Sequence, residues 1–156
     1  MKKFIWLNFC LLLLFSCDSD NLLKNSGPFA VEFNLKGAVD NAIQTLYISG
    51  VDNGSFDIND YQIEYDESDA HPNSKGFPAD LTNEDLQFEG TIRFFSPRLE
   101  SIYLEYTNLL NYDNGDTLEV TITIFRNGKV IDEISEVFSD NSLEIFRLNK
   151  SYNYAD

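Results

Sequence analysis

Carboxylates in two turn-rich loops are the side chains with the clearest capacity for chemistry. One loop follows an apolar run that ends at Val51, and the other precedes an apolar run that begins at Leu118. Clustered hard oxygen donors suit Ca²⁺, but neither loop has the ligand order of an EF-hand, and Asp-Asn-Gly is also ordinary turn sequence. The sequence therefore leaves two alternatives open. The loops are ordinary turns without any cofactor, or they are calcium sites. The candidate calcium ligands are Asp52, Asp57, Asp60, Asp113 and Asp116.

Residues for the common catalytic centres are scarce. The one histidine, His71, precedes Pro72 in a polar stretch, and no Gly-x-Ser-x-Gly motif is present. One histidine and no free thiol after N-terminal processing do not make the usual zinc ligand set. Two carboxylates would suffice for a glycosidase, but nothing in the sequence selects a pair. We therefore expect a protein that is not an enzyme.

Tyrosines raise the question of glycan binding, which needs aromatic platforms. Tyrosines at alternating strand positions more often pack on a sheet face or in a core, so a sugar platform is an alternative to sheet packing. The tyrosines considered are Tyr61, Tyr65, Tyr103, Tyr106, Tyr112, Tyr152 and Tyr154.

The segment Asp66–Asp85 is the longest stretch without a strand pattern, and such a stretch is unusual in a small domain. It contains an edge strand near Phe77–Leu81, a helical turn near Thr82–Asp85, or a functional loop. Phe77, between Gly76 and Pro78, is the candidate ligand-binding residue of this loop. The alternative is that Phe77 fastens the loop to the sheet.

The N-terminus has the pattern of an export signal. Lys2 and Lys3 precede a mostly apolar run that is too short to span a bilayer comfortably. The run ends in Leu14-Phe15-Ser16-Cys17, which resembles the bacterial lipoprotein signal. That resemblance implies cleavage before Cys17 and lipidation of its thiol; the alternative is an ordinary secretory signal. We expect a signal peptide over residues 1–16, a lipidated cysteine and flexible tether over 17–27, one domain over 28–150 and a tail over 151–156.

The residues after Cys17 bear on location. Asp18-Ser19-Asp20-Asn21 resembles the surface-export signal of Bacteroidota lipoproteins. We therefore expect a lipid anchor in the outer membrane with the domain at the cell surface, and a periplasm-facing domain as the alternative. An Asp directly after the cysteine would indicate retention at the inner membrane in other bacteria.

The chain is strongly acidic. Its formal charge is −15, and removal of Lys2 and Lys3 with the signal would take it to −17. Nucleic-acid binding requires clustered Lys and Arg, so nucleic acid is excluded as a partner. The charge is compatible with metal cations or a basic partner.

The remaining pattern is that of short strands separated by turns. Phe29, Val31, Phe33 and Leu35 alternate with polar residues, as expected for a strand with one buried face. Ile43–Val51 alternates less cleanly and is expected to be covered on both faces. Further strands are expected over 61–65, 86–95, 99–106 and 143–148. Pro97 is expected to end the strand over 86–95. With the hairpin below, seven or eight strands predict an all-β fold, a single antiparallel β-sandwich.

Thr117–Phe138 has the strongest local signal, that of a β-hairpin. Asn127-Gly128 supplies the two residues with positive φ that a type I′ turn requires. This turn would pair Arg126 with Lys129 and Ile124 with Ile131. The same register would set Glu133 opposite Ile122. Either Glu133 lies near the sheet margin or a β-bulge shifts the return strand.

The hairpin sequence Val120–Ile131, V-T-I-T-I-F-R-N-G-K-V-I, together with the lipoprotein signal resembles small immunoglobulin-like β-sandwich lipoproteins of Bacteroidota. The resemblance implies no catalytic residues. The expected function is that of a membrane-anchored envelope lipoprotein acting as a non-catalytic binding or accessory module. Its partners would be the membrane, through the lipid, and an envelope protein or glycan. The alternatives are a carbohydrate-binding module of a glycan-uptake system and an acidic inhibitor of a basic envelope-targeting enzyme.

Overall fold

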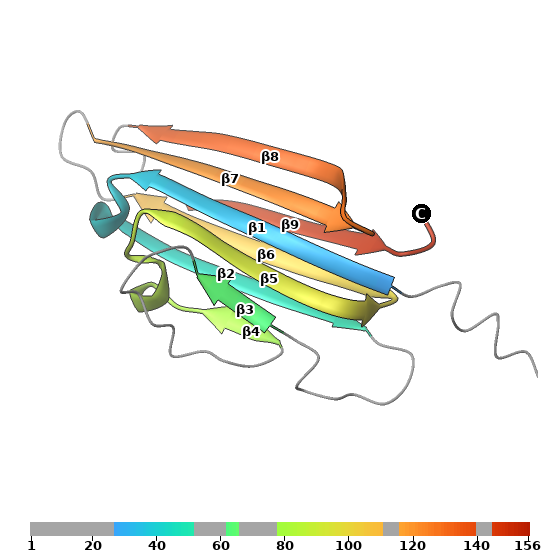
Figure 1. The fold of residues 1–156 in the computed structure, drawn as a ribbon. Helices are drawn as coiled ribbons and strands as arrows, with labels where there is room; N and C mark the ends of the chain where they lie inside the picture. Colours follow the sequence, from blue (N-terminus) through green and yellow to red (C-terminus); the bar gives the residue numbers. More distant parts are fainter. Residues whose placement is uncertain (1–26, 52–61, 66–77, 111–115, 140–144) are drawn as a thin grey trace, which may run out of the picture.

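The structure, a computed structural model, describes residues 27–51, 62–65, 78–110, 116–139 and 145–156. These residues form nine strands and two short 3₁₀ helices (Figure 1). The strands are β1 (Gly27–Gly37), β2 (Ala42–Val51), β3 (Gln62–Tyr65), β4 (Ala79–Leu81), β5 (Gly90–Leu99), β6 (Ser101–Leu110), β7 (Thr117–Arg126), β8 (Lys129–Ser139) and β9 (Phe146–Asn153). The 3₁₀ helices are η1 (Val39–Asn41) and η3 (Glu84–Leu86).

Two antiparallel sheets pack face to face, which confirms the predicted β-sandwich. Sheet A has the strand order β3-β5-β1-β7-β8, and sheet B has the order β4-β2-β6-β9. The eight expected strands are present, and the edge strand β4 is added to them. Both structured alternatives for Asp66–Asp85 are found, since β4 is followed by a helical turn at η3.

The core consists of the inward-facing residues of both sheets. In β1 and β7, every second residue from Phe29 to Leu35 and from Leu118 to Ile124 is at most 2% exposed. Sheet B faces them with Leu46, Ile48, Ile102 and Leu104. The expectation that Ile43–Val51 is covered on both faces was wrong, because Ile43 is 55% exposed. Sheet B therefore has an open outer face.

The β7–β8 hairpin has the predicted type I′ turn, with φ of 54° at Asn127 and 71° at Gly128. Its register shifts after Phe125–Val130, so that Ile124 pairs with Asp132 and Ile122 with Ile134. The bulge alternative is thus confirmed, and Ile131 is the extra residue. As a result Glu133 pairs with Thr123, and its side chain is exposed.

Three sequence-based boundaries were wrong. Pro97 does not end β5, which continues to Leu99, because Pro97 falls where the β1–β5 register shifts and the ladder is already interrupted. Leu86 and Phe88 are buried but lie before β5, which begins at Gly90. Ser151–Asn153, expected in the tail, continue β9 and pair with β6. The order of side chains on the two outer faces follows from these registers.

Candidate functional site

The outer face of sheet B carries an aromatic and polar cluster built from three adjacent strands. Tyr47 of β2 pairs with Glu105 of β6, which pairs in turn with Asn149 of β9. Tyr103 lies one step along the sheet, between Ser49 and Ser151. Leu46, Ile48 and Leu104 face the core, and the period-two alternation of a strand therefore sends these polar neighbours outward.

The members of this cluster contact one another. The ring centroids of Tyr47 and Tyr103 are 6.3 Å apart with an interplanar angle of 63°. The Tyr103 hydroxyl donates to Glu105 Oε2 at 3.0 Å and lies 3.3 Å from Asn149 Oδ1. The hydrogen bond with Glu105 raises the pKa of Tyr103, so its hydroxyl stays protonated as a donor at neutral pH. We call Tyr47, Tyr103, Glu105 and Asn149 the tyrosine face.

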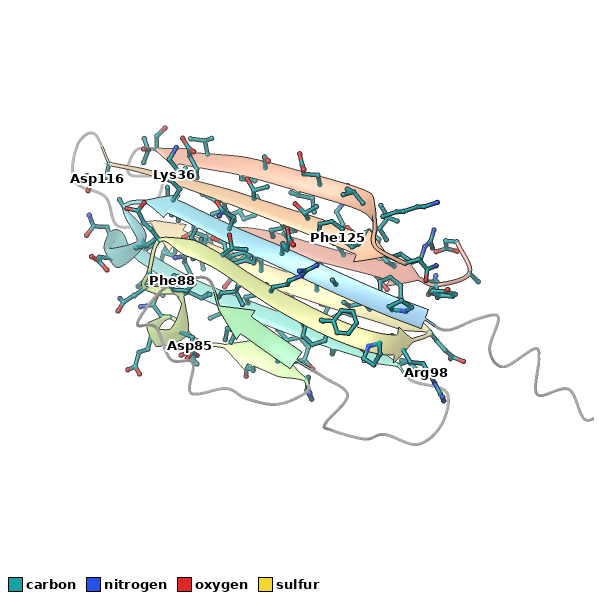
Figure 2. The ribbon with its side chains drawn as sticks, viewed as in Figure 1. Lys36, Asp85, Phe88, Arg98, Asp116 and Phe125 are labelled. Carbon is teal, nitrogen blue, oxygen red and sulfur yellow. The ribbon has the colours of Figure 1, made fainter. Side chains whose placement is uncertain are left out.

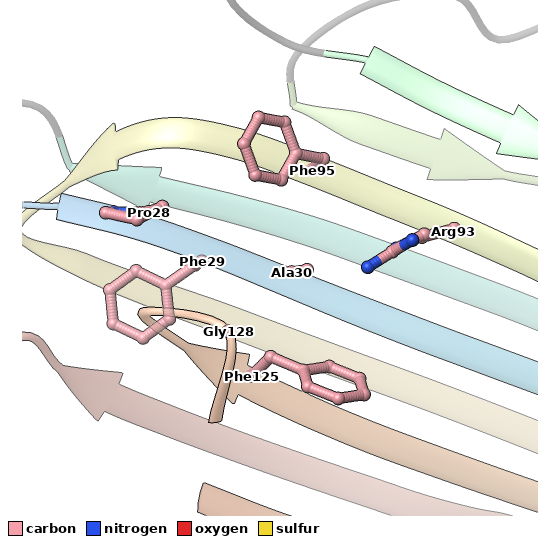
Figure 3. Close-up of a pocket in the computed structure, with 7 residues that line it drawn as sticks. All are labelled: Pro28, Phe29, Ala30, Arg93, Phe95, Phe125 and Gly128. Carbon is pink, nitrogen blue, oxygen red and sulfur yellow. The ribbon is translucent and has the colours of Figure 1, made fainter. Parts of the chain in front are cut away.

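The outer face of sheet A carries a different cluster, which is apolar. Phe95, Ala30 and Phe125 lie in register on β5, β1 and β7. The small side chain of Ala30 leaves a pocket of about 120 Å³ between the rings, with Pro28 at its edge (Figure 3). Arg93 also lines it and forms an ion pair with Glu32 at 3.4 Å. This volume is well below the roughly 300–1,000 Å³ of ligand pockets, so the pocket holds at most one ring or side chain.

A charged contact between the two sheets has a structural role. Asp132 of β8 accepts a hydrogen bond of 2.6 Å from the Tyr152 hydroxyl of β9, and Lys150 Nζ lies 3.5 Å from the same oxygen. The Tyr152 hydroxyl is the main cause that lowers the pKa of Asp132, and Lys150 lowers it further. A carboxyl with a lowered pKa stays ionised at neutral pH, which is unsuited to a general acid.

Most sequence-predicted site residues lie outside the described residues. This holds for Cys17, Asp52, Asp57, Asp60, Asp113 and Phe77. The exception is Asp116, whose Oδ2 accepts a hydrogen bond of 2.6 Å from Asn41 Nδ2 of η1. Within the described part of the chain, no group of three His, Cys, Asp or Glu side chains is arranged to hold a metal ion.

The two acidic loops depart from opposite ends of the sandwich. Val51, which precedes the first loop, pairs with Ser101, whereas Leu110, which precedes the second, pairs with Ala42. These pairs terminate the same two strands and are separated by roughly 30 Å, at about 3.3 Å per residue. Figure 2 shows Asp116 and Arg98 at opposite ends of the sandwich.

Sequence reasoning identified Tyr103 as a platform candidate but missed Tyr47, Glu105 and Asn149. Tyr106, another candidate, is 1% exposed and donates to Gln44 Oε1 at 2.8 Å inside the sandwich. The opposite parity of Tyr103 and Tyr106 along β6 was a signal that only one of them could face outward.

No helix in the described ranges is long and apolar enough to cross a membrane.

Comparisons with known proteins relate this architecture to three solved structures. No family model and no curated protein matches the sequence. A domain of unknown function, DUF4425, from Bacteroides vulgatus superposes with a TM-score of 0.60 at 13% identity, over 83% of this chain and 97% of that one. A DUF4425 family protein from Bacteroides ovatus gives 0.60 at 8% identity, over 81% and 95%.

The third is a protein from Parabacteroides distasonis in its calcium-bound form, with a TM-score of 0.58 at 17% identity, over 81% of this chain and 92% of that one. At these identities the comparison concerns the fold. The chain is thus similar in fold to DUF4425 proteins from Bacteroides and to a protein from Parabacteroides distasonis.

Proposed function

We propose that the protein is an immunoglobulin-like envelope lipoprotein, anchored through Cys17, that acts as a non-catalytic binding module for an oligosaccharide. The observation that carries this proposal is the tyrosine face. It combines two aromatic rings with a hydroxyl, a carboxylate and an amide on an open sheet surface.

The chemistry of a sugar matches this set of side chains. A pyranose ring presents C–H groups on its faces, which pack on aromatic rings, and hydroxyls at its edge, which exchange hydrogen bonds with polar side chains. Glu105 accepts, and Tyr103 and Asn149 can both donate and accept. The two rings are inclined at 63°, so both cannot lie flat against one planar surface. This favours a single, twisted glycan chain over a flat crystalline polysaccharide.

The same face is poorly suited to hydrolysis. Tyr47 pairs with Asp80 on one side and Glu105 on the other. These carboxyl-bearing residues are thus two strand spacings apart, roughly 9–10 Å. A glycosidase needs two carboxylates that flank the scissile bond, whereas here Tyr47 stands between the two acidic residues. Asp80 is also exposed to solvent.

Binding of oligosaccharides tests this proposal. Calorimetric titration with soluble glucans, mannans and host-type glycans should identify a ligand for the wild-type protein. Tyr47→Ala and Glu105→Gln should each weaken its affinity at least several-fold. Thr121→Ala, on the outer face of sheet A, is the matched control and should bind normally. If both tyrosine-face variants bind like the wild type, the ligand does not lie on this face.

The anchor is tested separately. Cys17→Ser should leave the protein unprocessed or release it from the membrane fraction. A processed, membrane-bound Cys17→Ser variant would exclude lipidation as the means of attachment.

Inhibition of a basic enzyme remains the alternative to glycan binding, and titration with lysozyme distinguishes the two.

Calcium binding is a second candidate function, favoured by the neighbour from Parabacteroides distasonis that was solved in its calcium-bound form. The candidate ligands are the carboxylates of the two acidic loops, Asp52, Asp57 and Asp60 in one and Asp113 and Asp116 in the other. Because the loops start at opposite ends of the sandwich, each would bind its own ion. Asp116 is already bonded to Asn41, so an ion there would share or replace that bond.

Calcium titration followed by thermal unfolding tests this second function. Calcium should raise the melting temperature more than magnesium does. Asp57→Asn and Asp113→Asn should each remove one site, with Asp156→Asn at the C-terminus as the control. An unchanged melting temperature in millimolar calcium would exclude both sites.

A further inference from the structure

An apolar row crosses the outer face of sheet A near the start of β1. Phe95, Ala30, Phe125 and Val130 pair in sequence across β5, β1, β7 and β8, and directly paired residues share a sheet face. Phe95 and Phe125 are half-buried, and Val130 is 55% exposed. Figure 3 shows both rings beside Ala30 on the same surface. This row is therefore an exposed apolar surface on a strongly acidic protein.

The row lies at the end of the sandwich where the domain joins its N-terminal segment. Gly27 begins β1, and the Asn127 amide donates to the Pro28 carbonyl at 3.0 Å, which fixes the β7–β8 turn beside it. Cys17 precedes Gly27 by ten residues. Even fully extended, such a segment spans at most about 33–36 Å. If Cys17 carries the lipid, this end of the domain faces the membrane.

Basic side chains border the row. Arg93 lines the pocket beside Ala30 and is ion-paired with Glu32, and Lys129 lies at the turn. Arg126 differs, because it alternates in step with the core residue Ile124 and its Nη1 donates to the backbone carbonyls of Asn153 and Tyr154, on the sheet B side, at 2.8 and 3.2 Å. Lys129 is exposed. Aromatic and aliphatic side chains bordered by Arg and Lys are the combination that binds lipid headgroups at a membrane surface.

We propose that the row formed by Phe95, Ala30, Phe125 and Val130 rests on the phospholipid headgroups of the membrane that carries the lipid anchor. This inference rests on the proposed lipidation of Cys17. The short tether keeps the row at a high effective concentration over the bilayer, so a weak contact is sufficient. The orientation has a functional result. With the outer face of sheet A on the membrane, the tyrosine face on sheet B points away from it, toward a glycan.

Depth-dependent quenching tests the orientation. The processed lipoprotein is expressed from the full-length chain and reconstituted in phosphatidylethanolamine and phosphatidylglycerol vesicles that contain brominated lipid. Lipid on Cys17 blocks that thiol, and Cys10 leaves with the signal, so an introduced cysteine is the single labelling site. Thr123→Cys reports the outer face of sheet A, and Thr45→Cys on sheet B is the matched control. A fluorophore at position 123 should be quenched several-fold more than one at position 45.

Two variants extend the test. Phe125→Gln and Lys129→Glu should each lower the quenching at position 123 toward the control level, and Lys129 lies in an exposed turn where the change leaves the fold intact. Equal quenching at both positions on a lipidated protein would overturn the proposal. So would self-quenching between labels at position 123, which would show that a second copy covers the row. An intact mass without acyl groups would instead remove the anchor itself and, with it, this inference.

Discussion

The hydroxyl of Tyr152 lies 2.6 Å from Oδ2 of Asp132, and this hydrogen bond joins the edge strands of the two sheets, β9 and β8. The bulge at Ile131 makes the contact available, because it places Asp132 opposite the core residue Ile124. Six residues farther along β8, Phe138 packs on Phe146 at the same edge with ring centroids 5.1 Å apart. A charged bond and an aromatic pair thus hold this side of the sandwich together.

Tyr152→Phe should destabilise the protein by about 1 kcal/mol at pH 7, the scale of one partly exposed hydrogen bond. The folded protein lowers the pKa of Asp132 from 3.8. The contribution is therefore present above pH 3.8 and is lost as the pH falls through the folded-state pKa. Urea unfolding should show a smaller difference from wild type at pH 2.5 than at pH 7. Tyr154→Phe is the control, since its hydroxyl bonds the neutral Asn127 amide. An equal cost of Tyr152→Phe at both pH values would contradict the assignment.

Ile122→Ala and Ile124→Ala should each cost roughly 2–5 kcal/mol in the free energy of unfolding, the range for large-to-small changes in a core. Both side chains are at most 1% exposed between the sheets. Thr121→Ala and Thr123→Ala on the same strand should cost much less, because these half-buried residues face outward. Denaturant titration of the four variants measures the difference. Similar losses for Thr and Ile would mean that a partner covers the outer face of sheet A.

Local alternation was enough to predict the sandwich and its hairpin, but not the registers that build the tyrosine face. The parity of Phe29 to Leu35 defines a buried face within one strand. In contrast, Tyr47, Glu105 and Asn149 meet only through the β2–β6 and β6–β9 pairings. A shift of one residue in either pairing would invert the faces. The bulge shows the same limit, because the hairpin sequence left it as one of two alternatives, and the contact of Asp132 that accompanies it is with Tyr152 on a distant strand.

Asn108→Leu should stabilise the protein by roughly 1 kcal/mol or more, since leaving a buried polar group unpaired costs about 1–3 kcal/mol. Asn108 is 1% exposed, and neither its Nδ2 nor its Oδ1 has a partner among the described residues. Leucine has a similar volume and suits the apolar interior. Gln44→Leu at the paired position is the comparison and should gain less, because it removes the acceptor of the Tyr106 hydroxyl. A loss of stability in Asn108→Leu would show that the amide is paired in solution.

Gly37→Ala should destabilise the fold more than Gly128→Ala does. Both glycines have positive φ, 104° and 71°, so alanine meets backbone strain of about 1–2 kcal/mol at either position. At Gly128 a new Cβ has no atom within 4 Å, and strain is the whole cost. At Gly37 it would collide with the Thr117 carbonyl, which also accepts the Ala38 amide at 2.8 Å. The carbonyl cannot move away without breaking that bond between the end of β1 and the start of β7. Melting temperatures should therefore fall in the order wild type, Gly128→Ala, Gly37→Ala, and equal values for the two variants would mean that the chain relaxes around Gly37.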